Sequence, residues 1–297
     1  MKRLLVIGGS GLVGSALLKS ASGRYEMFFT YLNHPLDLSD ASGVKLDIAQ
    51  REMVSSVMEQ LKPDVIVHTA ALRSLDYCEE HPDEARKVNI DGTENIALAA
   101  TQCNARLIHI STDSVFDGQK GMFTEDDTPG PVTAYGRTKL EAEQKVMEIV
   151  SDALIVRPSS IYGRSPRGQS IAEWILGQLK QGLSIKMFSD AFFSPILSGN
   201  LAEAILDMHE RGLKGTYHIA GSQRCSRYDF ALEIVRVFEL DESLVQPSTM
   251  AQDEVKLRAP RPRDSSLSVA KASGDIGIPL LDVRDGLIQF RELLEEA

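Results

Sequence analysis

The first half of the chain alternates short apolar runs with longer segments in which apolar residues recur at helical spacing. The apolar runs have the length of β-strands, and the segments between them have the length and charged faces of α-helices. This alternation predicts repeated βαβ units and therefore an α/β fold with a Rossmann-type doubly wound parallel sheet. The predicted strands cover residues 3–7, 25–31, 65–69, 106–110 and 153–156, and the predicted helices cover residues 49–61, 83–102 and 133–150.

After Pro158 the chain becomes richer in short turns, which break its helical stretches into smaller pieces. Residues 201–210 then have the pattern of a helix and residues 216–219 that of a strand, so we expect the chain to return to the sheet. A cleft between the two parts is the natural place for a substrate. We expect a dinucleotide-binding domain over residues 1–157 and a smaller, interleaved, mainly substrate-binding part over residues 158–297, of which roughly residues 196–220 return to the Rossmann sheet.

The first predicted strand runs directly into a glycine-rich turn, GGSGLVG over residues 8–14, and then into a helical segment. The glycines can be aligned as GxGxxG or as GxxGxxG, and either spacing lets backbone amides approach a pyrophosphate at a helix N-terminus. A tight turn without a ligand is the alternative, but the position at a strand-to-helix junction favours a dinucleotide. The cofactor contacts predicted in this turn are Gly8, Gly11, Leu12, Val13 and Gly14.

Composition narrows the classes of partner. The formal net charge is −10, which argues against nucleic acid and anionic membranes because no basic excess is available to neutralise phosphates. The N-terminus lacks the pattern of a signal peptide and no apolar run reaches membrane-spanning length, so we expect a cytoplasmic protein. The three cysteines show no paired spacing and no metal-ligand pattern occurs, so we expect free thiols and no metal.

Tyr135 and Lys139 lie at the two ends of a YxxxK motif at the start of a predicted helix, so their side chains share one face. A free phenol has a pKa of about 10, and a nearby ammonium in a partly dry cleft lowers it toward the range useful for acid–base chemistry. The motif also occurs by chance in helices, but here a hydroxyl-rich segment, residues 111–118, follows the predicted strand 106–110. Side chains at the carboxyl end of a parallel strand line the ligand crevice, which directs Thr112 toward the pair.

With these features the chain resembles the extended short-chain dehydrogenase/reductase family over nearly its whole length. Within that family it is closely similar to dTDP-4-dehydrorhamnose reductases, which act in nucleotide-linked rhamnose biosynthesis. The regulatory beta subunit of methionine adenosyltransferase is similar in most of the same segments and in HPDEARKVNIDGTEN over residues 81–95. The segments that carry the resemblance to the reductases are STDSVFDG (111–118), AYGRTKLEAE (134–143), GTYHIAG (215–221) and APRPRDSSL (259–267).

The resemblance implies catalytic roles for three residues. Tyr135 would donate the proton, Lys139 would bind the nicotinamide ribose and lower the pKa of the tyrosine, and Thr112 would hold the substrate oxygen. Asn89 matches a helix asparagine that helps to hold an active-site water or the lysine, with buried helix capping as a comparable explanation. Asp47 resembles an adenine-contacting aspartate and suits the N-cap of the following helix equally well. The further cofactor contacts that the resemblance implies are Ile48, Thr69, Ala70, Ala71 and Pro158.

The end of the second predicted strand governs the choice between NAD and NADP, because a carboxylate there accepts the ribose 2′-hydroxyl of NAD. Residues 28–34, which include Tyr31 as a predicted cofactor contact, carry no carboxylate. They also carry no arginine that would clamp a 2′-phosphate. We expect NADP(H) as the cofactor, with NAD(H) as the alternative.

A cluster of arginines interrupts the otherwise acidic chain near its C-terminus. The resemblance places Arg261 and Arg263 near the diphosphate of a nucleotide sugar, a task that suits guanidinium groups, whereas a solvated loop is the generic explanation. Ser114 stands where these reductases usually have tyrosine, and Ser160 stands where they often have tryptophan. Both serines enlarge the predicted sugar-binding pocket, so the identity of the sugar stays open.

Three functions are compatible with these features. The first is reduction of a 4-keto nucleotide-diphosphate sugar, with the hydride from the nicotinamide and the proton from Tyr135. The second is a sugar-nucleotide epimerase or dehydratase, although dehydratases place an Asp-Glu pair where this chain has Asp113 and Ser114. The third is a non-catalytic, NADP-binding regulatory subunit of another enzyme, which can carry the same residues. The sequence leaves open the nucleotide and the formation of a homodimer.

Overall fold

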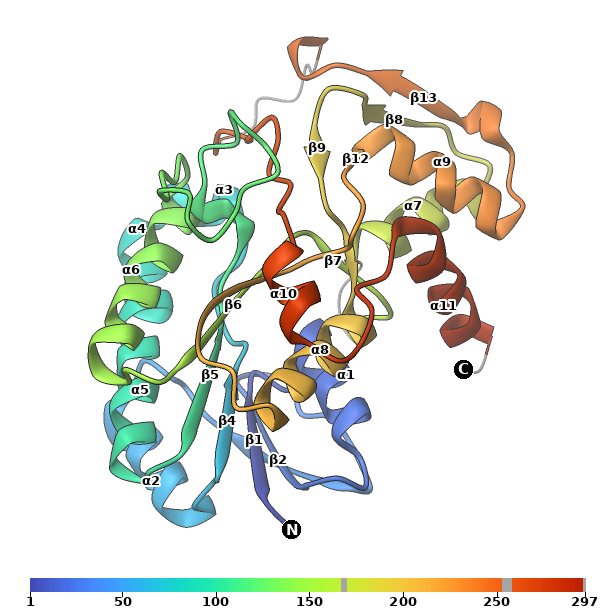
Figure 1. The fold of residues 1–297 in the computed structure, drawn as a ribbon. Helices are drawn as coiled ribbons and strands as arrows, with labels where there is room; N and C mark the ends of the chain where they lie inside the picture. Colours follow the sequence, from blue (N-terminus) through green and yellow to red (C-terminus); the bar gives the residue numbers. More distant parts are fainter. Residues whose placement is uncertain (167–169, 253–257, 296–297) are drawn as a thin grey trace.

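Seven parallel strands form the central sheet of the computed structural model, which describes residues 1–166, 170–252 and 258–295. They are β1 (Arg3–Ile7), β2 (Glu26–Tyr31), β3 (Ala41–Lys45), β4 (Val65–His68), β5 (Arg106–Ile110), β6 (Leu154–Pro158) and β11 (Gly215–Ile219). Their spatial order is β11-β6-β5-β4-β1-β2-β3 (Figure 1). The predicted Rossmann-type fold is confirmed, and the reversal of strand order between β1 and β4 is where such folds bind ligands.

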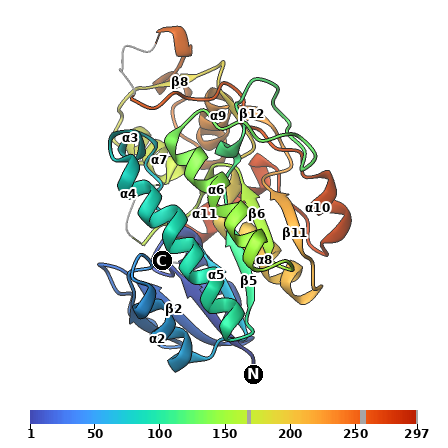
Figure 2. The same ribbon diagram turned by 90° about the vertical axis from the view of Figure 1, so that its left-hand side faces the viewer.

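Helices cover both faces of the sheet. They are α1 (Leu12–Ala21), α2 (Arg51–Leu61), α3 (Leu75–Glu80), α4 (Pro82–Arg86), α5 (Gly92–Gln102), α6 (Ala134–Ile149), α8 (Ser198–Glu210) and α10 (Ala270–Asp275). Figures 1 and 2 show α2, α5 and α6 on one face, and α1, α8 and α10 on the other. Successive strand side chains point to opposite faces, so Leu4 and Val6 join the α1–α8 core while Leu5 and Ile7 join the α2–α5 core.

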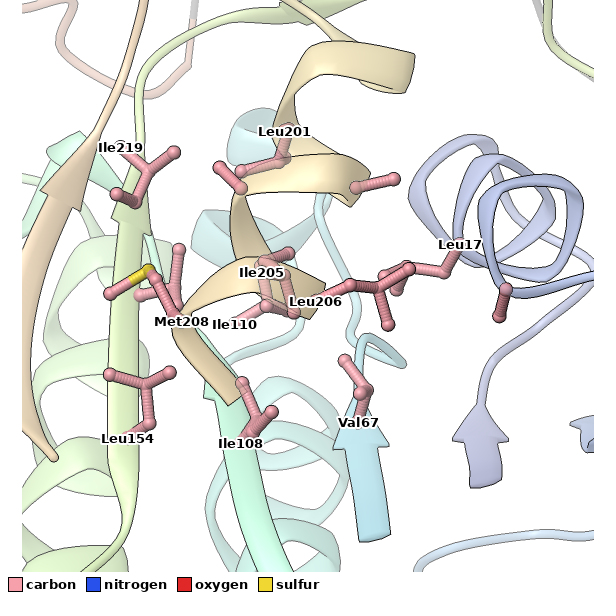
Figure 3. Packing of buried hydrophobic residues seen from close by; sticks show 14 of the residues in the cluster. Leu17, Val67, Ile108, Ile110, Leu154, Leu201, Ile205, Leu206, Met208 and Ile219 are labelled. Atoms are coloured by element: carbon pink, nitrogen blue, oxygen red, sulfur yellow. The ribbon is translucent and has the colours of Figure 1, made fainter. Parts of the chain in front are cut away.

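Helix α8 anchors a late part of the chain to this sheet. Its residues Leu201, Ile205 and Leu206 belong to one buried cluster with the strand residues Ile108 and Leu154 (Figure 3). All five side chains are almost completely buried, and each such burial stabilises the fold by about 1.5–3 kcal/mol. The packing of α8 places the next strand, β11, beside β6 at the edge of the sheet.

The remaining elements form a second layer with its own core. Tyr162, Phe193, Phe230 and Phe290 meet there edge to face, with centroids 5.3 to 6.0 Å apart. Three two-stranded sheets, β10-β7, β12-β9 and β13-β8, frame this core. The elements are β7 (Ile161–Tyr162), α7 (Ile171–Lys180), β8 (Ile185–Phe188), β9 (Phe192–Phe193), β10 (Ile196–Leu197), β12 (Cys225–Ser226), α9 (Arg227–Phe238), β13 (Val245–Ser248) and α11 (Val283–Glu295).

The structure adds two features that the hydrophobic pattern does not predict. Strand β3 reads Ala-Ser-Gly-Val-Lys and has little apolar character, but Gly43 lets it approach the ring of Phe29, to which a Cβ would come within 2.6 Å. The predicted helix over residues 83–102 is interrupted by a π-helical turn at Lys87–Asp91. Within the described residues, no helix is long and apolar enough to cross a membrane.

Candidate active site

A cleft of about 1080 Å³ opens at the carboxyl ends of the central strands, between the sheet and the second layer. Its walls come from the turn after β1, the loops after β2, β4, β5 and β6, and the start of α9. Gly14, Asn89, Lys139 and Arg263 are not among its lining residues. The predicted site residues that line it are Gly8, Gly11, Leu12, Val13, Tyr31, Asp47, Ile48, Thr69, Ala70, Ala71, Thr112, Ser114, Tyr135, Pro158, Ser160 and Arg261.

The glycine turn brings the N-terminus of α1 to this cleft. Gly8 has a φ of +82°, a left-handed conformation that glycine adopts without strain, and its carbonyl accepts the Gly11 N–H at 3.0 Å. A Cβ on Gly14 would lie 2.5 Å from the Gly8 oxygen, so the helix packs against the turn only without a side chain there. Gly14 therefore shapes the turn from behind while Gly11 and Leu12 line the cleft.

The polar residues expected to contact the cofactor, Asp47, Thr69 and Asn89, make hydrogen bonds within the protein. Asp47 lines the cleft and accepts the Ala49 N–H at 3.0 Å, but the N-cap of α2 is Gln50. Thr69 donates its hydroxyl hydrogen to the Ile7 carbonyl at 2.8 Å, which ties the loop after β4 to β1. Asn89 lies in the π-helical turn, where its amide bonds the Leu72 backbone and the hydroxyl of Thr138 rather than Lys139.

Helix α6 brings Tyr135 to Thr112. The Thr133 hydroxyl caps the helix by accepting the Gly136 N–H at 2.9 Å. Gly136 carries no side chain, and a Cβ there would collide with the Ser114 carbonyl, so glycine allows the close approach. The Thr112 hydroxyl lies close enough to the phenol of Tyr135 to favour its phenolate, and both residues line the cleft. These two groups are positioned to meet one oxygen atom of a substrate.

Lys139 is completely buried and points toward β5 rather than toward the phenol. Its Nζ donates to the Ile110 carbonyl at 2.8 Å and lies 3.1 Å from Nε2 of His109. Burial lowers the pKa of Lys139 to about 8, opposed by the negative charge of Glu143. The predicted lowering of the Tyr135 pKa is not found here: burial raises it, and the hydrogen bond from Thr112 only partly offsets that effect.

Asp113 and Arg227 line the cleft, and neither of them was assigned a role from the sequence. Asp113 is buried, which raises the pKa of its carboxyl group, and it accepts a hydrogen bond from Ser159 at 2.9 Å. Arg227, the first residue of α9, lies with its guanidinium carbon 4.3 Å above the Phe193 ring and close enough to Asp113 to interact with its charge. No local motif marks Arg227, because its place in the cleft depends on the packing of the second layer.

The arginine cluster divides between cleft and surface. Arg261 lines the cleft, donating to the Asp76 carboxylate at 2.8 Å and to the Ala259 carbonyl at 2.9 Å. Arg258 forms an exposed ion pair with Glu80. Arg263 does not line the cleft, so Arg261 is the member of the predicted pair that faces it. Ser114 and Ser160, the two positions that depart from the reductase pattern, both line the cleft.

Comparison with known proteins identifies the family to which the chain belongs. The model of the RmlD substrate binding domain matches residues 1–295. The dTDP-4-dehydrorhamnose reductase of Aggregatibacter actinomycetemcomitans is 30% identical over 99% of this chain and 100% of its own length. Methionine adenosyltransferase 2 subunit beta of Bos taurus is 30% identical over 91% of this chain and 81% of its own length.

A solved structure extends the likeness to three dimensions. The dTDP-4-dehydrorhamnose reductase of Bacillus anthracis, crystallised in complex with NADP, superposes with a TM-score of 0.85 at 27% identity, covering 99% of this chain and 100% of that one. The family resemblance read from the sequence is confirmed by this structure and by the sequence relatives. The chain belongs to the RmlD substrate-binding-domain family, the family of the dTDP-4-dehydrorhamnose reductases.

Proposed function

We propose that this protein reduces the ketone of a 4-keto nucleotide-diphosphate sugar with NADPH. The observation that carries the proposal is that Tyr135 and Thr112 lie close together in a cleft that is also lined by the glycine turn of a dinucleotide-binding fold. We assign dinucleotide binding to residues 1–157 and substrate binding mainly to residues 158–297, with the segment around α8 and β11 serving the sheet.

The residues present fit an NADP(H) molecule. The glycine turn offers backbone N–H groups and a helix N-terminus to a pyrophosphate, and bulk at Gly14 would close that turn. Tyr31, Asp47 and Ile48 line the cleft where β2 ends and after β3, and we assign them to the adenosine; Thr69 to Ala71 and Pro158 line it after β4 and at the end of β6. When bound, the dinucleotide supplies the hydride. The choice of NADP(H) agrees with the NADP complex of the Bacillus anthracis relative.

The chain's own residues handle the proton and the orientation of the ketone. Thr112 holds the substrate oxygen, and Tyr135 transfers its phenolic proton to that oxygen as the carbon is reduced. Because burial disfavours the phenolate, the proton stays on Tyr135 until the oxygen develops negative charge. Arg261 meets the diphosphate, and Ser114 and Ser160 border the sugar.

A regulatory role is the second candidate. It is favoured by the similarity to methionine adenosyltransferase 2 subunit beta, which is as high in identity as the similarity to the bacterial reductase. Such a subunit would bind NADP(H) in the same cleft without turning over a keto sugar. A stable complex with a synthetase, together with no turnover of any keto-sugar nucleotide, would favour this role. Epimerase or dehydratase chemistry is less favoured, because Ser114 follows Asp113 where a dehydratase has its second acid.

NADPH is expected to bind at least as tightly as NADH. Residues 30–34 line the cleft without a carboxylate that would repel a 2′-phosphate. Asn33→Asp should weaken NADPH selectively by bringing like charges together. Fluorescence titration of both cofactors measures this, with Asn33→Gln as the uncharged control. A clear preference of the unmodified protein for NADH would refute the assignment.

Arg261→Ala is expected to raise the KM for a nucleotide-diphosphate sugar by roughly 10- to 150-fold, the loss of one charge-assisted hydrogen bond worth about 1.5–3 kcal/mol. The affinity for NADPH should hardly change. Arg263→Ala, in the same segment but outside the cleft lining, is the matched control and should have a much smaller effect. An unaltered KM in Arg261→Ala, or equal kcat/KM for the free keto sugar and its nucleotide, would remove the diphosphate from this site.

A further inference from the structure

We propose that His109 is a positioning residue for Lys139: it stays neutral with its proton on Nδ1 and holds the lysine ammonium in place through Nε2. This inference rests on the proposed function, with Lys139 in the role that the family resemblance implies, binding of the nicotinamide ribose. It concerns a residue inside β5 that lines no part of the cleft.

The side chains of His109 and Lys139 are in direct contact and are shielded from solvent. His109 is fully buried and Lys139 is 2% exposed, and their nitrogens lie 3.1 Å apart. Within the part of the chain that the structure describes, the other polar contact of the ammonium is the Ile110 carbonyl at 2.8 Å. An ammonium removed from water needs acceptors for its N–H groups, so these two atoms decide where Nζ lies.

The direction of the hydrogen bond fixes the tautomer. An ammonium has only donors, so Nε2 of His109 must accept and carries no proton. The imidazole proton of the neutral ring is then on Nδ1. Burial and the nearby positive charge of Lys139 lower the pKa of His109 well below its usual value, so the ring remains an acceptor at neutral pH.

A second buried histidine, His68, lies beside His109 and has the opposite tautomer, with its proton on Nε2. Thr93 donates its hydroxyl hydrogen to the Asn89 carbonyl at 2.7 Å, so its oxygen accepts from Nε2 of His68 at 3.0 Å. Nδ1 of His68 is therefore a bare acceptor, and burial holds the pKa of this ring at about 3. Among the described residues neither Nδ1 has a partner, and the two rings lie 5.2 Å apart. No hydrogen bond joins the two rings, so the tautomer of His109 is assigned from its contact with Lys139.

The network has a predictable effect on titration. The groups that act on Lys139 are the carboxylate of Glu143 on α6, which favours the ammonium, and the neutral imidazoles of His109 on β5 and His68 on β4. Because Nε2 of His109 accepts a stronger hydrogen bond from the ammonium than from the neutral amine, its removal disfavours the charged form. The pKa of Lys139, about 8 in the intact protein, should then fall, and the alkaline limb of the pH–rate profile should move to lower pH.

The test is to titrate Lys139 in intact protein by heteronuclear NMR of the lysine ε-carbons, assigned with Lys139→Met. His109→Phe should lower the pKa of Lys139 by about 1 to 2, and His109→Gln, whose amide oxygen can accept, should restore most of it. NADP(H) titration of the same variants should show at least about 10-fold weaker binding for Phe than for Gln. His109→Leu replaces the Phe variant if the latter does not fold.

His218→Gln is the matched control: it is a fully buried histidine whose Nδ1 contacts the Phe123 carbonyl and not the lysine, so Lys139 should titrate as before. An unchanged pKa of Lys139 in His109→Phe or His109→Leu would overturn the inference. This readout requires no turnover. An inactive protein in which Lys139 still responds to His109 would contradict the proposed reductase function and leave the positioning role standing.

Discussion

Tyr135→Phe is expected to lower kcat by about 10²- to 10⁴-fold while the affinity for NADP(H) stays nearly unchanged, because a positioned general acid is worth that much. The half-buried Tyr135 lies beside Thr112 in the cleft, so loss of its hydroxyl removes the proton donor and leaves the ring in place. Single-turnover kinetics with a keto-sugar nucleotide and fluorescence titration of the cofactor separate the two effects.

Tyr217→Phe is the matched control for this substitution. Its phenol donates to Asp275 at 2.8 Å and lies outside the cleft lining, so loss of the hydroxyl there should leave kcat close to that of the unmodified protein. A Tyr135→Phe variant that keeps the original kcat would show that the proton comes from another group.

Lys139→Met should weaken both turnover and cofactor binding. This contrast with Tyr135→Phe distinguishes a residue that binds the cofactor from one that only donates a proton.

Arg157→Met is expected to lower the free energy of unfolding by about 3–5 kcal/mol, because it leaves the buried carboxylate of Glu143 without its partner. The two groups form a bidentate pair at 2.9 and 2.6 Å, with side-chain exposures of 7% and 6%. Glu143 also accepts the hydroxyl of Ser111 at the end of β5, so the pair ties α6 to β5 and β6 beneath Lys139. Urea denaturation with a fixed slope measures the loss.

An exposed ion pair and a double variant serve as controls for this stability measurement. Arg86→Met breaks an exposed ion pair with Glu141 and should be nearly neutral. Combining Arg157→Met with Glu143→Leu removes both charges and should recover much of the stability, since two buried apolar groups need no ionic partner. If Arg157→Met is as mild as Arg86→Met, the buried pair does not hold α6 in place.

Local patterns pointed to the glycine turn and to Tyr135 and Thr112, all of which line the cleft. The glycine turn could be identified from the sequence because Gly8 and Gly14 lie in a single β–α junction where a side chain would collide with neighbouring backbone atoms. Tyr135 and Thr112 could be paired because a helix start and a strand end face the same edge of the sheet. Both inferences used only the hydrophobic periodicity of the chain and the topology of a parallel sheet, and neither required the packing of the second layer.

The remaining features depend on tertiary packing. Arg227 reaches the cleft only because α9 packs in a separate core, and the direction of Lys139 depends on acceptors that β5 presents. His109 sits in an apolar strand, where a histidine has the pattern of an ordinary core residue. The YxxxK spacing places two side chains on one face, but it does not say that burial will outweigh the ammonium in setting the pKa of the phenol.

The most direct test of the proposed reductase activity is to follow a label from cofactor to product. The purified protein is incubated with NADPH deuterated at nicotinamide C4 and a panel of 4-keto nucleotide sugars, and the products are analysed by mass spectrometry and NMR. We expect deuterium on C4 of the product sugar for at least one nucleotide-linked substrate, and label transfer slower by about 10²- to 10⁴-fold with Tyr135→Phe. Tight binding of NADPH without label transfer to any member of the panel would contradict the reductase assignment.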